Sequence, residues 1–230
     1  MARVGFLVNP VAGLGGRVGL KGTDGVADEA VRRGAIPVAP AKAEEMLRAL
    51  AGMPQSRSIE WITASGPMGQ DALTATGFAV EVVHRSHAPT TSTDTEEACK
   101  AFLARKVDLI VFVGGDGTAR DIVAAVGSAV PIVGVPAGVK MHSAVFGLHP
   151  QSVAAILVDF VDGTTATVDA EVLDLDEEKY RQGEWVVRLY ATAKTLHEPT
   201  LIQTGKMMFE ELPEVDARDA IAEHVIEEME

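Results

Sequence analysis

The chain has few of the residues that build covalent or metal-based frameworks. Cys99 is its only cysteine, which excludes an intramolecular disulfide and a cysteine-based zinc site. Aromatic residues make up 5% of the 230 residues. A core must therefore be built from Val, Ala, Leu and Ile, a composition that favours helices on a parallel sheet. No apolar run reaches the ~18 residues of a membrane span, so no membrane contact is expected.

Targeting signals and basic residues are also scarce. The N-terminus lacks a basic start followed by an apolar secretory stretch, which predicts a cytoplasmic protein. The net charge of −13 argues against a nucleic-acid binder. Much of the negative charge lies in residues 207–230, where nine acidic residues accompany one arginine. We interpret this end as a solvated acidic helix from about Val215, which leaves the rest of the chain able to hold an anionic ligand.

Short apolar runs alternate with helical patterns along the first two thirds of the chain. The runs predict strands at residues 4–9, 35–38, 59–63, 78–83, 107–113 and 131–135. Helical spacing of apolar residues marks 41–51 and 95–105. This alternation predicts an α/β fold, an open parallel sheet with flanking helices that is Rossmann-like, with right-handed crossovers.

The pattern changes after Gly163. Residues 164–176 and 184–195 show partial alternation around a predicted turn at Gln182 and Gly183. We therefore expect an α/β nucleotide-binding domain over 1–163, and a short, incomplete β-rich domain plus the acidic C-terminal helix over 164–230. So small a β-rich part needs cover from the first domain or another chain. Its apolar side chains predict a homo-oligomer that forms through this segment: Val168, Val172, Leu173, Leu175, Trp185, Val186, Val187, Leu189 and Tyr190.

The strongest chemical signal follows the apolar run at 107–113. The next residues are Gly114, Gly115, Asp116, Gly117 and Thr118. Glycines let the backbone approach a ligand closely, and a helix that starts here offers free N–H groups to phosphate. Thr118 has the spacing of a capping box with the acid three residues later. An acid among phosphate-binding glycines indicates a metal or hydroxyl contact or a base, and the alternative is a plain turn with a capping Asp116.

A second turn with polar residues follows the run at 131–135. It contains Gly138, Lys140, His142 and Ser143. Because neighbouring carboxyl-end loops of a parallel sheet line one crevice, this turn should face residues 114–118. Lys140 is then placed to neutralise phosphate, and His142 or Ser143 to bind a ribose or phosphate. The alternative is that Met141 packs while Lys140 and His142 are solvated.

A third, glycine-rich segment follows the first predicted strand over residues 9–25. It matches neither the dinucleotide-binding glycine pattern nor the P-loop. It is interpreted either as a lid over phosphates or as a flexible surface loop. The candidate ligand-binding residues in it are Asn9, Gly13, Gly15, Gly16, Arg17 and Lys21.

Other polar residues carry weaker signals. Residues 93–95 precede a predicted helix and are interpreted as a cap rather than as a ligand contact. The histidines outside the second turn show no metal-ligand spacing, so no metal-binding residues are predicted. Ser65 and Ser143 lack the surroundings of a nucleophile elbow, which disfavours hydrolase chemistry.

The motif at 114–118, after a Val/Ile/Phe strand, resembles the ATP-NAD kinase superfamily, which is related to diacylglycerol kinases and phosphofructokinases. Residues 9–25, 107–122 and 136–146 look closer still to the archaeal and bacterial ATP-NAD kinase-like branch that includes acetoin-catabolism X-type proteins. The resemblance extends over nearly the whole chain, including residues 170–176 and 187–190.

The resemblance implies an α/β domain followed by a β-rich domain, with the site between them. It implies transfer of a phosphoryl group from ATP or polyphosphate to the 2′-hydroxyl of NAD, with magnesium accompanying the nucleotide. Asp116 would then be the acid beside the acceptor hydroxyl. The phosphates would be cradled by Gly114, Gly115, Gly117 and Thr118.

The chain departs from the family pattern in two respects. Family members are usually longer, and no Asn-Asp or Asn-Glu pair follows Gly163. Two alternatives to an NAD kinase therefore stay open. One is a non-catalytic nucleotide-binding or regulatory module. The other is a kinase of another hydroxyl acceptor, such as a lipid or a sugar.

Overall fold

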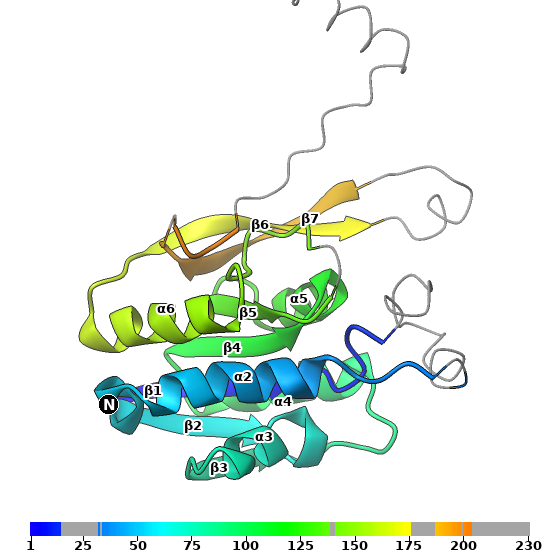
Figure 1. Cartoon of the computed structure of the whole chain (residues 1–230). Helices are drawn as coiled ribbons and strands as arrows, with labels where there is room; N and C mark the ends of the chain where they lie inside the picture. The colour runs from blue at the N-terminus through cyan, green and yellow to red at the C-terminus, as the bar shows by residue number, and fades with distance from the viewer. Residues whose placement is uncertain (15–31, 33, 139–140, 176–186, 199, 204–230) are drawn as a thin grey trace, which may run out of the picture.

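A five-stranded parallel sheet forms the centre of the molecule (Figure 1). The structure, a computed structural model, describes residues 1–14, 32, 34–138, 141–175, 187–198 and 200–203. The strand order is β3-β2-β1-β4-β5, which confirms the predicted open α/β sheet. The strands are β1 (Ala2–Val8), β2 (Ile59–Ala64), β3 (Val80–His84), β4 (Leu109–Gly114) and β5 (Ile132–Pro136).

Helices cover both faces of this sheet. The helices α2 (Ala39–Ala51), α3 (Gln70–Ala75) and α6 (Pro150–Asp162) share one apolar cluster with the sheet. The helices α4 (Ser92–Ala104) and α5 (Asp116–Val126) pack in the cluster on the other face. Two short 3₁₀ helices, η2 (Pro54–Ser58) and η3 (Gly66–Met68), flank β2. Within the described residues, no helix has the length and apolar character needed to cross a membrane.

The strand predicted at 35–38 is wrong. Residues 35–37 have no regular structure, Val38 is the N-cap of α2, and the helix begins at Ala39. Pro37 has no N–H to donate to a strand ladder, and Pro40 in the first turn suits a helix start. Ala35 is nevertheless buried against Leu14, whereas Ile36 is exposed.

A small antiparallel sheet follows α6 and consists of β6 (Thr167–Leu175) and β7 (Val187–Leu196). Its inner face is covered, because Ala170, Val172 and Ala193 are buried in the apolar cluster that contains α5. On β7, Leu189 and Tyr190 are exposed. The predicted turn at 182–183 and the predicted acidic helix lie outside the described residues, and assembly through this sheet stays a prediction.

Candidate functional site

The ends of β1, β4 and β5 meet at one edge of the sheet. These strands are neighbours and parallel, so their carboxyl ends lie together. Backbone hydrogen bonds continue past the strands: Asn9 N donates to Val113 O at 2.9 Å, and Ala137 N donates to Gly114 O at 3.0 Å. The loops after the three strands therefore surround one position at this edge, which is where open α/β sheets bind ligands.

Gly13 brings the first loop against the third. Its φ is +80°, and a Cβ built on it would lie 2.1 Å from the carbonyl oxygen of Ala137. Only glycine fits a contact that close, because that distance is far inside van der Waals separation. The predicted neighbours Gly15, Gly16, Arg17 and Lys21 lie outside the described residues, so the structure does not place the rest of this loop.

Asn9 links the first loop to the start of α5. Its Nδ2 donates to Thr118 Oγ1 at 2.9 Å, and its Oδ1 accepts from Val11 N at 3.2 Å. Thr118 is buried, and its side chain packs under Gly114, where an added Cβ would lie 2.5 Å from Thr118 Oγ1. The glycine at 114 thus lets β4 run directly into the helix.

The predicted capping box at Thr118 is wrong. Gly115, in extended conformation, is the N-cap, so α5 begins at Asp116, three residues earlier than that pairing requires. The Thr118 hydroxyl accepts from Asn9 instead. The N–H groups of Asp116, Gly117 and Thr118 belong to the first turn, where backbone donors have no partner within the helix and favour an anion.

The carboxylate of Asp116 holds the loop after β5. Its Oδ2 accepts from His142 N at 2.9 Å, and its Oδ1 accepts from Ser143 N at 2.9 Å and Ser143 Oγ at 2.6 Å. The predicted meeting of the 114–118 and 135–143 segments is therefore present. Two of these three donors are backbone N–H groups, so the carboxylate fixes the backbone of the loop after β5.

The remaining residues of this loop are more buried than a solvated turn would be. Met141, His142 and Ser143 are all buried, and a Cβ on Gly138 would lie 2.2 Å from Met141 Cε. Packing of Met141 agrees with the structural alternative, whereas burial of His142 does not. Lys140 lies outside the described residues.

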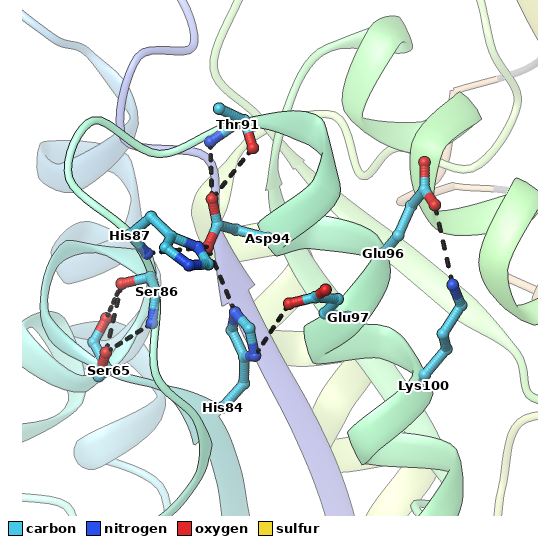
Figure 2. A network of polar contacts seen from close by, with 9 residues as sticks. All are labelled: Ser65, His84, Ser86, His87, Thr91, Asp94, Glu96, Glu97 and Lys100. Atoms are coloured by element: carbon cyan, nitrogen blue, oxygen red, sulfur yellow. Dashed lines mark hydrogen bonds and ion pairs between the residues drawn. The ribbon is translucent and has the colours of Figure 1, made fainter.

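A second polar cluster lies at the start of α4, after β3 (Figure 2). Asp94 is fully buried. Its Oδ2 accepts from Thr91 N at 2.9 Å and Thr91 Oγ1 at 3.1 Å. Its Oδ1 accepts from His87 N at 2.8 Å and contacts His87 Nδ1 at 2.8 Å and His84 Nε2 at 3.4 Å. Asp94 lies in the first turn of α4 and forms a capping box with the N-cap Thr91, so the capping role is present although residues 93–95 do not precede the helix as predicted. Asp94 also gathers two histidines that the spacing did not single out.

The electrostatics of this cluster follow from those contacts. Burial on its own raises the pKa of Asp94, but hydrogen bonds from His87 N, Thr91 N and the two imidazoles outweigh it, so the pKa lies well below its usual value. The hydrogen bond to Asp94 and its negative charge raise the pKa of His87. Among the described residues, no group of three or more His, Cys, Asp or Glu side chains is placed to hold a metal ion.

A family model described as the ATP-NAD kinase N-terminal domain matches residues 4–165. No curated protein matches the chain.

Two solved structures from Bacillus anthracis str. Sterne are similar in part. One is a proposed diacylglycerol kinase, 16% identical with a TM-score of 0.34, which matches 76% of this chain and 45% of that one. The other is described as a diacylglycerol kinase, 17% identical with a TM-score of 0.34, which matches 76% of this chain and 43% of that one. The chain spans about half the length of the solved structures that it matches.

Proposed function

The chain belongs to the ATP-NAD kinase family, and on that premise we propose that it transfers a phosphoryl group from ATP or polyphosphate to the 2′-hydroxyl of NAD, giving NADP. One observation carries the proposal: an acid, Asp116, stands at the start of a helix at the carboxyl edge, beside the backbone donors that suit phosphate. The negative charge of an acid in that position repels bound phosphate. Its presence there therefore indicates a chemical role at the acceptor hydroxyl.

The hydrogen bonds of Asp116 indicate which oxygen performs the task. Oδ1 accepts two bonds from Ser143, whereas Oδ2 accepts one from His142. A carboxylate oxygen has two lone pairs, so Oδ2 keeps one acceptor position for the ribose hydroxyl. As the O2′–P bond forms and the bond from the γ-phosphorus to the bridging oxygen breaks, the hydroxyl proton passes to Oδ2.

Magnesium belongs to the proposal as a companion of the nucleotide. Magnesium is usually held by one or two carboxylates together with substrate phosphates, rather than by an all-protein cage. The absence of a three-residue cluster among the described residues fits that mode. Magnesium would lower the cost of charge on the phosphates, while the N–H groups in the first turn of α5 would position them and Asp116 would hold the acceptor hydroxyl.

The test is NADP formation by the purified chain from NAD and either ATP with magnesium or polyphosphate. Parallel reactions replace NAD with diacylglycerol or a sugar. NADP formation that Asp116→Asn abolishes supports the proposal. Phosphorylation of another acceptor, without NADP formation, would show that the chain is a kinase of that acceptor instead. Nucleotide binding with no transfer to any acceptor would favour the non-catalytic module.

A further inference from the structure

The loop that Asp116 holds is also fastened to the small sheet. Ser143 is completely buried, and its Oγ accepts from Leu173 N in β6 at 3.0 Å. The next residue continues the attachment, because Ala144 N donates to Glu171 O at 2.9 Å. The Ser143 hydroxyl thus stands between a strand of the small sheet and the carboxylate at the candidate site.

The distances fix the direction of the hydroxyl proton. Ser143 Oγ lies 2.6 Å from Asp116 Oδ1 and 3.4 Å from Leu173 O. A serine hydroxyl has one proton, so it donates along the shorter contact, to Asp116. Its lone pair then faces the N–H of Leu173, and the hydroxyl is held at both ends.

The small sheet is irregular at the point of attachment. The pairing of β6 with β7 shifts register between Val172 and Leu173, so that Val172 pairs with Ala191 and Leu173 with Leu189. Such bulges bend a strand locally and re-aim the groups beside them, and they are frequent next to active sites. Here the bend coincides with the residue whose N–H reaches Ser143.

We propose that Ser143 is a positioning residue. Held by the small sheet, its hydroxyl fixes which oxygen of Asp116 faces the acceptor hydroxyl. With the serine hydroxyl present, Oδ1 carries two donors and Oδ2 carries one. Without it, each oxygen would keep one backbone donor, the two would become equivalent, and the carboxylate could rotate. This inference rests on the proposed function, because the oxygen matters only where a hydroxyl is deprotonated.

The kinetic test compares Ser143→Ala with Ser143→Thr, which keeps a hydroxyl. The matched control is Thr195→Val. Thr195 is also buried and also joins the small sheet to the large one, since its Oγ1 donates to Ile132 O at 2.8 Å, but that hydrogen bond does not involve Asp116. We expect Ser143→Ala to lower kcat for phosphoryl transfer by roughly 10–100-fold, the scale for a misplaced catalytic group, with KM for ATP little changed. Ser143→Thr should recover most of kcat.

A second measurement needs no activity. Amide hydrogen exchange at Leu173 should quicken roughly tenfold in Asp116→Ala, the scale of losing one hydrogen bond, while exchange in β7 around Thr195 stays the same. If the wild-type chain transfers no phosphate but exchange at Leu173 responds, the proposed function fails and the coupling stands. Unchanged exchange at Leu173, or an equal fall of kcat in Thr195→Val, would overturn the inference. Should Ser143→Ala fail to fold, the exchange comparison still decides it.

Discussion

Two aspartates, Asp94 and Asp116, lie at the starts of helices on the same face of the sheet but differ in burial and in hydrogen-bond partners. Asp94 in the first turn of α4 is fully buried and takes its donors from residues 3, 7 and 10 positions earlier in the chain. Asp116 at the start of α5 is only partly buried and takes its donors from residues 26 and 27 positions later. One carboxylate closes its own loop, and the other joins two distant loops.

The difference separates a structural acid from a functional one. Asp94 has five donors around it, so no acceptor position is left for a ligand. Asp116 has three donors and retains one position on Oδ2. Substitution of Asp116 should therefore act chiefly on turnover, and substitution of Asp94 chiefly on stability.

The largest expected effect is on turnover in Asp116→Asn. We expect kcat for NADP formation to fall by roughly 10²–10⁴-fold, the range for losing a general base. The amide also places an NH₂ group against an N–H of residue 142 or 143, so unfolding should become easier by about 1–3 kcal/mol. Steady-state kinetics and urea unfolding measure the two effects. Wild-type kcat in this variant would reduce Asp116 to a turn residue.

For Asp94→Ala we expect a loss of stability with little change in turnover. Removing a buried carboxylate leaves donors from His87, His84 and Thr91 unpaired, which should lower the free energy of unfolding by about 3 kcal/mol. Turnover per folded molecule should change little, because no ligand position is lost. Urea unfolding with kinetics at low temperature tests this. A fall in kcat as large as that of Asp116→Asn would remove the distinction between the two acids.

Gly13→Ala tests the contact between the first and third loops, and Gly34→Ala is its control. Both glycines have nearly the same φ, +80° and +81°, but a Cβ on Gly34 would meet nothing within 4 Å. The control should lose ~1–2 kcal/mol from backbone conformation alone. Gly13→Ala should lose more and should weaken nucleotide binding, because the Ala137 carbonyl must move. If thermal unfolding shows equal losses of stability in the two variants, the close approach of Gly13 to the Ala137 carbonyl does not contribute to stability.

The smallest expected effect is the pH dependence of the Asp94 cluster. The pKa of His87 is raised above its usual ~6.5, so its ring stabilises the fold fully below about pH 6.5, and this contribution fades as the pH rises through the folded pKa. The pKa of Asp94 is lowered, so its contribution is present above ~4 and fades as the pH falls through the folded value.

His87→Ala should therefore lower Tm most between about pH 5 and 6.5, and the difference from wild type should shrink toward pH 9. The control is His197→Ala, at an exposed histidine just after β7. Melting curves across this range decide the matter, and a difference that grows with pH would contradict the assignment.

Local sequence signals predicted the large sheet and the meeting of two loops at its carboxyl edge. Apolar runs mark β4 and β5, and parallel pairing brings their ends together, so the meeting of 114–118 with the 135–143 turn could be foreseen. The run at 35–38 misled because a short apolar stretch resembles a strand even where it contains a proline, here Pro37.

The hydrogen bonds of the site could not be foreseen in the same way. The pairing of Asp116 with Ser143 spans 27 residues and depends on how the loop folds back from β5. Thr118 was misread because a side-chain spacing suggests a cap even where Gly115 supplies the helix start. The histidines around Asp94 were missed because their convergence depends on the path of the loop after β3.

The measurement that tests the central claim most directly is the nucleotide-induced shift in unfolding of three proteins: wild type, Asp94→Ala and Gly13→Ala. At about 100 times the dissociation constant, ATP with magnesium or NAD should stabilise the wild-type chain by roughly 2.7 kcal/mol. The account predicts the same gain for Asp94→Ala from its lower baseline and a much smaller gain for Gly13→Ala. No shift in the wild-type chain, or loss of the shift in Asp94→Ala with retention in Gly13→Ala, would contradict a nucleotide site at the edge formed by β1, β4 and β5.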